Sequence, residues 1–308
     1  MKQAALKLAR RIKRKYAPAF VNQHADYIEQ IINKVSFGQD PQKLKENLEE
    51  ICISNLQSQK DRNAAAEILE SEGIFVIPNF FDSHKCDEIK KLLQFKITSN
   101  EKVKGTGNAD IELDNIYIHK TGKKFISYTD RQNFHKAIAD IRGGKDKGMI
   151  DIFNADLAFS ELKELRLAFE NPQLAEVIKK AGYESACPTN LNIYINKDIL
   201  TTRGFHIDSV GPNLKGFIYL SDIKTMDKGP YCYVRQSHRD QIPARSFNQA
   251  FSHKTNRTAT DAPFVDPFMV TPVLARKGDL VVSDQSGIHR GYPQSPGSER
   301  FMAVMRYK

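Results

Sequence analysis

The chain has little of what marks membrane, secreted or disulfide-stabilised proteins. No run among its 308 residues approaches 18 uninterrupted apolar residues, so we expect no transmembrane helix. The N-terminal region lacks the apolar core and small-residue cleavage site of a secretory signal. The four cysteines form no CxxC pair, which argues against a zinc site or a disulfide framework and favours a reducing compartment. A cytoplasmic localisation is therefore predicted.

Positive charge is concentrated in one segment. Residues 1–16 carry seven Lys or Arg side chains and no acidic one, and removing them from the net charge of +9 leaves +2. Their apolar residues Ala5, Leu8, Ile12 and Tyr16 make a narrow helical stripe. Two alternatives follow for this segment: peripheral contact with an anionic membrane, or a solvated helix on the body of the protein. Nucleic-acid binding is not expected, because no groove-reading motif or interleaved aromatic residues accompany the charge.

The first seventy residues are predicted to be helical. Apolar residues recur at helical spacing in four segments, 5–16, 28–35, 44–51 and 64–69. Pro18, Gly38 and Pro41 separate the first three of them. We therefore predict an N-terminal helical extension over residues 1–64 and one further domain over residues 65–308.

Short β runs dominate the second half of the chain. GIFVIPNFF at 73–81 predicts a strand, Asp82 or Ser83 can cap a helix from Lys85 to Leu93, and residues 132–182 are interpreted as helical. The β runs after Leu191 are LNIYI, LKGFIYL, PYCYV, FMVTPVL, DLVVS and RFMAVMRY. Short strands at this spacing indicate a sandwich or barrel. The predicted fold is α+β, with a jelly-roll-like double-stranded β-helix core and surrounding helices.

One His-x-Asp motif can bind a metal ion. In GFHIDSV, His206 and Asp208 are two residues apart, so on an extended segment both side chains point to the same face. His289 follows Asp208 by 81 residues, at the end of another β run. Two histidines and one carboxylate, with positions left open, are typical of non-haem iron(II) oxygenases. His-x-Asp alone is common, and the alternative for each histidine is a structural role.

Arg300 strengthens the prediction of a metal enzyme. It follows His289 by eleven residues and begins the last β run. On a strand beside the distal histidine, its guanidinium can bind the far carboxylate of 2-oxoglutarate through two parallel hydrogen bonds. The His-x-Asp pair, the distal histidine and the arginine, in this order along the chain, favour an enzyme that depends on Fe(II) and 2-oxoglutarate.

With these residues the chain resembles the phytanoyl-CoA dioxygenase family over roughly residues 65–308. The resemblance rests on GIFVIPNFF, TTRGFHIDSV, DKGPYCYVRQSHR, His289 after KGDLVVSDQ, and Arg300. It implies Fe(II) held by His206, Asp208 and His289, 2-oxoglutarate held at Arg300, and hydroxylation of a small or carrier-linked organic substrate with dioxygen, releasing succinate and CO2. Similar halogenases have Gly or Ala in place of the carboxylate ligand, so Asp208 favours hydroxylation.

Other polar residues near the motifs have weaker assignments. Asn192 and Tyr194 share one face of LNIYI and can either hydrogen-bond the cosubstrate inside a barrel or face solvent. The cations near the motif ends are interpreted mainly as exposed loop charges, with anionic substrate binding as the alternative: Arg203, Lys215, Arg235 and Arg290. His238 is predicted to be structural, and Asp284 to have no chemical role. Tyr231 and Tyr233 are predicted to pack, with lining of the pocket as the alternative.

A non-catalytic function remains as the alternative class. A jelly-roll scaffold can hold a metal or recognise a ligand without turnover, since fold alone does not specify function. The complete set of ligand residues together with Arg300 favours the enzyme. No motif distinguishes an acyl-CoA from a sugar, an amino acid or another small metabolite, and none specifies an oligomeric state.

Overall fold

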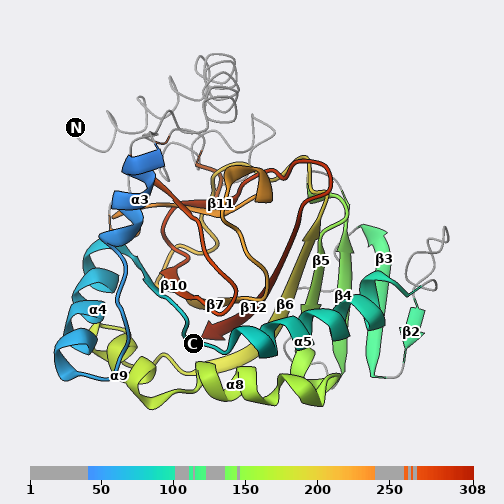
Figure 1. Cartoon of the computed structure of the whole chain (residues 1–308), viewed down its shortest axis with the longest axis horizontal. Helices are drawn as coiled ribbons and strands as arrows, with labels where there is room; N and C mark the ends of the chain where they lie inside the picture. The colour runs from blue at the N-terminus through green and yellow to red at the C-terminus, as the bar shows by residue number, and fades with distance from the viewer. Residues whose placement is uncertain are drawn as a thin grey trace, which may run out of the picture.

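Two facing β-sheets and a layer of helices make up the described part of the chain (Figure 1). The computed structural model describes residues 41–100, 111–113, 115–122, 136–143, 146–239, 260–262, 265 and 269–308. Within them a nine-stranded, mostly antiparallel sheet has the order β1-β10-β7-β12-β6-β5-β4-β3-β2, and a smaller sheet has the order β11-β8-β9. This arrangement is mixed α and β and consistent with a jelly-roll-like core.

The strands of the large sheet are β1 (Ile74–Ile77), β2 (Ile111–Leu113), β3 (Ile116–Gly122), β4 (Ala137–Arg142), β5 (Ile150–Phe153), β6 (Pro188–Lys197), β7 (Leu214–Tyr219), β10 (Leu280–Asp284) and β12 (Glu299–Tyr307). The small sheet contains β8 (Tyr231–Val234), β9 (Val270–Val273) and β11 (His289–Gly291). All six β runs predicted after Leu191 are confirmed, as is the strand predicted at GIFVIPNFF.

The helices described are α3 (Pro41–Glu49), α4 (Gln59–Glu72), α5 (Ser83–Leu93), α8 (Lys163–Phe169) and α9 (Pro172–Lys180). Short helical turns also occur, namely η2 (Gln94–Thr98), η4 (Ala155–Leu157), η5 (Ser160–Leu162) and η6 (Met226–Lys228). Asp82 caps α5 as predicted, accepting hydrogen bonds from the backbone N–H groups of His84 at 2.8 Å and Lys85 at 2.9 Å.

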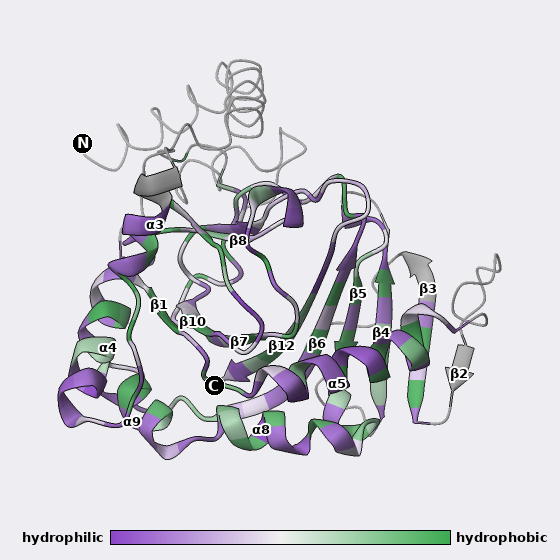
Figure 2. Cartoon of the chain, in the orientation of Figure 1, coloured by the Kyte–Doolittle hydropathy of each residue, from purple (hydrophilic) through white to green (hydrophobic). Residues whose placement is uncertain are grey.

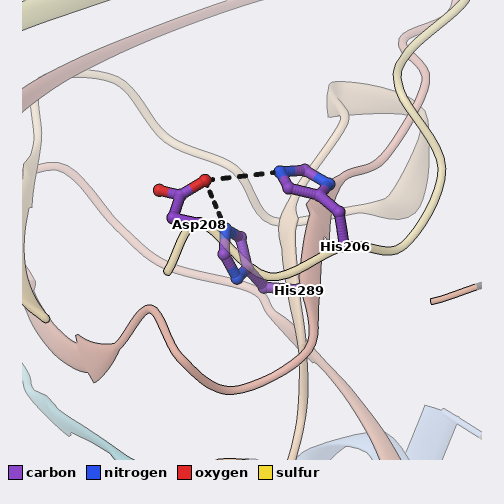
Figure 3. Close-up of side chains that lie close together, drawn as sticks. All are labelled: His206, Asp208 and His289. Atoms are coloured by element: carbon purple, nitrogen blue, oxygen red, sulfur yellow. Dashed lines mark ion pairs between the residues drawn. The ribbon is translucent and has the colours of Figure 1, made fainter. Parts of the chain in front are cut away.

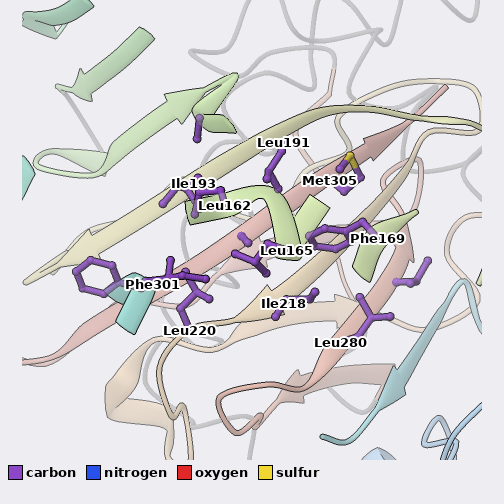
Figure 4. Packing of buried hydrophobic residues seen from close by; sticks show 14 of the residues in the cluster. Leu162, Leu165, Phe169, Leu191, Ile193, Ile218, Leu220, Leu280, Phe301 and Met305 are labelled. Carbon is purple, nitrogen blue, oxygen red and sulfur yellow. The ribbon is translucent and has the colours of Figure 1, made fainter. Parts of the chain in front are cut away.

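Helices cover one face of the large sheet. Apolar side chains of α8 and the turn before it, including Leu162, Leu165 and Phe169, pack against strand residues such as Ile193 and Phe301 (Figure 4). In Figure 2, α5 and α8 show polar residues on their outer sides, as expected for helices with one buried stripe. The smaller sheet packs against the opposite face of the large sheet.

The second core lies between the two sheets. Phe217, Val281 and Met302 of the large sheet form one buried cluster with Tyr231 and Tyr233 of the small sheet. Side chains alternate along a strand, so this inner face of β12 carries the even-numbered residues from Arg300 to Arg306. Polar residues on the same face can therefore meet between the sheets.

The structure corrects the helical prediction for residues 132–182. Only its second half is helical, as α8 and α9, whereas β4 and β5 are strands. Alternating residues of these segments pack on the helix side, including Ala139 and Ile152, while Asp140 faces Asp151 across the strand pair. β5 also pairs with β6, and this long-range pairing outweighs the local helix preference of short segments.

Two of the four helical segments predicted at the N-terminus lie within the described residues. The third and fourth predicted helical segments are confirmed as α3 and α4. The first two, with the basic segment 1–16, lie outside the described residues. The boundary after residue 64 stays a prediction and falls within α4, whose Ala65, Ala66 and Leu69 are buried in the core. No helix in the described part of the chain is long and apolar enough to cross a membrane.

Gly278 gives a prediction about stability. Its φ is +92°, and a Cβ there would lie 2.3 Å from the Phe81 carbonyl oxygen, whereas Gly182 has φ +90° with nothing within 4 Å. Gly182→Ala should cost about 1–2 kcal/mol from left-handed strain alone. Gly278→Ala should cost roughly 1–3 kcal/mol more, from crowding. Urea unfolding of both variants measures the difference, and equal losses would contradict the close approach.

Candidate metal centre

Three side chains predicted to bind metal lie together between the sheets (Figure 3). One donor atom from each of His206, Asp208 and His289 lies within 4.8 Å of the other two. Asp208 Oδ1 is 3.7 Å from His206 Nε2 and 3.7 Å from His289 Nε2. Metal–donor bonds of about 2 Å allow donors up to about 4 Å apart to share one ion. The geometry therefore suits a site with two imidazole ligands and one carboxylate ligand.

Backbone pairing brings the two histidines together although 83 positions separate them. His206 N–H donates to the His289 carbonyl at 3.0 Å, and His289 N–H donates to the His206 carbonyl at 2.8 Å. This is an antiparallel bridge, in which directly opposite side chains lie on the same side. Asp208 N–H donates to Gln285 O at 2.9 Å, which extends the pairing by two residues and places its carboxylate beside the imidazoles.

Hydrogen bonds orient both imidazole rings. His206 Nδ1 lies 2.8 Å from Gly204 O, and His289 Nδ1 lies 2.9 Å from Gly287 O. A carbonyl oxygen can only accept, so Nδ1 carries the proton in each ring and Nε2 presents its lone pair to the centre. Burial lowers the pKa of His206 to about 3, and the nearby His289 adds to the effect. A neutral imidazole is the form that binds a metal ion.

Lys215 forms an ion pair with the carboxylate of Asp208. Its Nζ donates to Asp208 Oδ2 at 2.6 Å, and its side chain is 12% exposed. Partial burial raises the pKa of Asp208, but Lys215 and the two imidazoles more than offset this and hold it well below its ordinary value. Because Oδ2 is occupied by Lys215, Oδ1 is left for a metal ion. Lys215 was not among the predicted site residues.

Lys215→Met is predicted to weaken metal binding by about 10- to 100-fold, the usual effect of removing a hydrogen bond that orients a ligand. The overall fold should persist, because methionine retains the aliphatic packing of the stem. Isothermal titration with Mn(II) or Co(II) measures the affinity. Lys180→Met, at an exposed position on α9, is the matched control. Equal affinities in the two variants would contradict the supporting role of Lys215.

Arg300 is a buried cation at one end of the inner face. Only 4% of it is exposed, its Nη1 donates to Gly229 O, and its Nε has no hydrogen-bond partner among the described residues. None of the described acidic side chains forms an ion pair with it. Two nearby polar atoms, Asn196 Oδ1 and Tyr219 Oη, are also buried and unpaired within the described part of the chain. Burial lowers the pKa of Arg300 below its ordinary value.

The position of Gly291 shows how Arg300 lies relative to His206, Asp208 and His289. An ideal Cβ at Gly291 would be 3.1 Å from Arg300 Nη2. Gly291 and His289 are two residues apart on β11, so their side-chain directions are the same. The Arg300 guanidinium therefore lies on the same side of β11 as the His289 side chain. It is displaced from that side chain along the strand by one repeat, roughly 7 Å.

Asn192 and Tyr194 both face the interior of the two-sheet core. Asn192 is 1% exposed and its Oδ1 accepts a hydrogen bond from Asn154 N–H at 3.1 Å, so this oxygen has a structural role. Tyr194 is 7% exposed and pairs directly with Met302 of β12, between Arg300 and the strand level of Asn192. The solvent-facing alternative for these residues is wrong. Their contact with a cosubstrate stays a prediction.

The cations assigned mainly to exposed loops are paired or buried instead. Lys215 contacts Asp208, and Arg203 Nη2 lies 2.8 Å from Asp261 Oδ1. Arg235 Nε lies 2.8 Å from Glu72 Oε2, and Arg290 is 1% exposed with Nη2 2.7 Å from Thr202 Oγ1. The exposed-loop interpretation is wrong for Lys215, Arg235 and Arg290, because long side chains can fold back onto the body and form hydrogen bonds or ion pairs there, whereas Arg203 lies in a loop with its side chain 36% exposed.

The neighbouring side chains have packing and hydrogen-bonding roles. The Tyr231 ring lies 5.6 Å from the His289 ring, and its hydroxyl lies 3.2 Å from Ser283 Oγ. Tyr233 donates to Asp284 O at 3.0 Å. Asp284 Oδ2 accepts from Tyr183 Oη at 2.8 Å, and His238 Nε2 lies 3.0 Å from Glu70 O. These contacts agree with the structural roles predicted for the tyrosines and His238.

Comparison with solved structures supports the fold. The epimerase SnoN, in complex with Fe3+, alpha ketoglutarate and nogalamycin RO, is similar with TM-score 0.54 and 14% identity over 81% of this chain and 84% of SnoN. HygX from Streptomyces hygroscopicus, with nickel and 2-oxoglutarate bound, has TM-score 0.51 and 15% identity over 78% of this chain and 84% of HygX. EvdO2 from Micromonospora carbonacea var. aurantiaca has TM-score 0.52 and 13% identity over 83% and 92%.

No protein-family model matches the chain, and no curated protein sequence matches it. At identities of 13–15% the structural likeness shows a shared fold and leaves the activity to be argued from the residues of this chain.

Proposed function

We propose that the chain is an Fe(II)- and 2-oxoglutarate-dependent oxygenase that hydroxylates a small or carrier-linked organic substrate. One observation carries the proposal. A three-residue metal site and a buried arginine without an ion-pair partner among the described residues lie on the same side of β11, one strand repeat apart. A metal site alone supports several functions, whereas the added cation supports a dicarboxylate that binds both.

The donor set fits iron. Two imidazoles and one carboxylate on one side of an ion leave coordination positions open, the arrangement typical of Fe(II) oxygenases. Structural zinc sites usually have four protein ligands, and no fourth His, Cys, Asp or Glu joins this group among the described residues. The open positions are what a chelating cosubstrate and dioxygen require.

The residues around Arg300 fit the far carboxylate of 2-oxoglutarate. Its buried Nε and the hydroxyl of Tyr219 are donors without partners among the described residues. Leaving such groups unpaired costs about 1–3 kcal/mol each, and a bound carboxylate would remove that cost. The roughly 7 Å between the Gly291 and His289 positions suits a five-carbon dicarboxylate that binds the metal at its other end. Tyr194, on the adjacent strand, is positioned to line its path.

The order of the strands supports a double-stranded β-helix. The central strands of the large sheet run β10-β7-β12-β6, and the bridge at His206 adds a fourth segment to β11-β8-β9. Four central strands of the large sheet that face four segments of the smaller sheet fit the double-stranded β-helix that the resemblance to the phytanoyl-CoA dioxygenase family implies. The similar structures SnoN and HygX bind 2-oxoglutarate with iron or nickel, which also favours these cofactors here.

Each residue has a defined task in this proposal. His206, Asp208 and His289 hold the iron, Lys215 keeps Asp208 to one ligating oxygen, and Arg300 orients the cosubstrate. When bound, iron and 2-oxoglutarate supply dioxygen activation coupled to decarboxylation of the cosubstrate to succinate. The apolar core residues Phe217, Tyr231 and Met302 exclude water from the reacting groups.

Succinate formation tests the proposal. Purified protein with Fe(II), 2-oxoglutarate and dioxygen should release succinate and CO2, and a compatible substrate should accelerate this release. Product analysis with 18O2 then separates hydroxylation, which incorporates label, from epimerisation or ring closure, which does not. One Fe(II) per chain with no succinate from any substrate would instead support a non-catalytic metal-binding protein.

Gly291→Ala provides a finer test of the cosubstrate geometry. The added methyl group would crowd Arg300 Nη2 at 3.1 Å, so the affinity for 2-oxoglutarate should fall by about tenfold while the metal affinity changes little. Gly211→Ala is the matched control, because a Cβ there meets nothing within 4 Å. Titration of the metal-loaded variants with 2-oxoglutarate gives both affinities. Unchanged binding in Gly291→Ala would contradict the placement of the cosubstrate.

A further inference from the structure

Arg306 is a second cation on the inner face of β12. It lies directly opposite Lys215 of the neighbouring strand β7, and the two residues share the face that carries Met302 and Val304. Its Nε is buried and has no hydrogen-bond partner among the described residues. No carboxylate in the described part of the chain forms an ion pair with it.

Arg306 and Arg300 flank the metal centre from opposite ends. Arg300 lies beside Gly291, two residues from His289, whereas Arg306 neighbours Lys215, which bonds to Asp208. Six residues of extended strand, about 20 Å, separate their backbones. An anion held at Arg306 would therefore reach the metal centre from the side opposite to the proposed cosubstrate.

The carboxylates on this part of the inner face bond to other cations. Asp208 Oδ2 accepts from Lys215 Nζ at 2.6 Å, and Asp151 Oδ2 accepts from Arg142 Nε at 2.7 Å, while Asp151 Oδ1 has no hydrogen-bond partner among the described residues. Tyr194, on the neighbouring strand β6, lies on the same inner face and pairs with Met302 of β12. A cation on an interior face is stabilised by an anion there, and no described carboxylate forms an ion pair with Arg306.

We propose that Arg306, next to the ion pair of Lys215 with Asp208, forms an anion subsite for the organic substrate, which carries a carboxylate or phosphate group near its reacting carbon. This inference rests on the proposed oxygenase function and adds the class of substrate. The subsite orients the substrate toward the metal centre through the guanidinium of Arg306. Neutral analogues lack the group that Arg306 binds and are poor substrates.

Paramagnetic relaxation tests the subsite without knowledge of the substrate. The full chain is loaded with Mn(II) and saturating 2-oxoglutarate, and inorganic phosphate and acetate are titrated separately while 31P and 13C relaxation are measured. We expect saturable relaxation enhancement by at least one of the two anions. Arg306→Gln should weaken that binding at least tenfold, Arg306→Lys should restore part of it, and Lys180→Gln, which removes an exposed charge, should leave it unchanged.

The outcomes separate the subsite from the oxygenase proposal. Enhancement by phosphate alone or by acetate alone identifies the anionic group, and either result supports the subsite. If metal and 2-oxoglutarate bind but neither anion does, or if anion binding survives in Arg306→Gln, the subsite is overturned and the oxygenase proposal stands. A loss of 2-oxoglutarate affinity in Arg306→Gln also overturns it, because Arg306 would then serve the cosubstrate. If wild-type protein binds neither Mn(II) nor 2-oxoglutarate, both proposals fail.

Discussion

His289→Ala is expected to lower the affinity for Fe(II) by at least about 100-fold and to abolish succinate formation. Removing a hydrogen bond behind a ligand commonly costs 10- to 100-fold in metal affinity, so removing the ligand itself should cost more. His206→Ala should behave in the same way, because both Nε2 atoms lie 3.7 Å from the same carboxylate oxygen. Metal analysis after dialysis and isothermal titration with Fe(II) under anaerobic conditions measure the loss.

The exposed His84 on α5 provides the matched control for this prediction. Its side chain is 82% exposed and lies outside the candidate metal centre, so His84→Ala removes an imidazole without touching the triad. Thermal unfolding of all three variants checks that they fold. Wild-type metal affinity in a folded His289→Ala protein would remove His289 from the ligand set.

Local spacing joined two of the three residues of the candidate metal centre, and backbone pairing brought the third beside them. His206 and Asp208 could be joined from sequence because residues two apart on an extended segment share a face. His289 could be proposed only as a distant candidate, since its position beside His206 depends on an antiparallel bridge between segments 83 residues apart. Such long-range pairing leaves no local signal in the sequence.

Lys215 was assigned mainly to an exposed loop although a signal for its true position was present. In LKGFIYL it alternates with Phe217 and Tyr219, which places it on their face of the strand. A charged residue on a buried face is unusual unless it is paired, and its partner Asp208 could not be identified without the fold. The strands β4 and β5 were mistaken for helix for a similar reason, since their pairing partners decide their conformation.

Arg300→Ala is expected to weaken 2-oxoglutarate binding by about 30-fold to several thousand-fold while leaving metal affinity nearly unchanged. Truncating one partner of a buried, hydrogen-bonded charge pair costs about 2–5 kcal/mol, which corresponds to this range. Arg300→Lys should recover only part of the loss, because an ammonium cannot make two parallel hydrogen bonds to one carboxylate. Arg300 is 4% exposed, so solvent does not screen its interaction with the carboxylate of 2-oxoglutarate.

Two control variants separate this role from general effects of removing an arginine. Arg166→Ala removes a guanidinium on α8 that pairs with Asp156 and Glu170 on the helix side of the sheet, and it should bind 2-oxoglutarate normally. Arg306→Ala tests the other cation on the inner face of β12. Titration of 2-oxoglutarate into each metal-loaded protein, followed by the visible charge-transfer absorption of the Fe(II) complex, gives the affinities. If Arg306→Ala lost the cosubstrate and Arg300→Ala retained it, the cosubstrate would lie at the opposite end of β12, and the dicarboxylate would reach the metal past Lys215 instead of past Gly291.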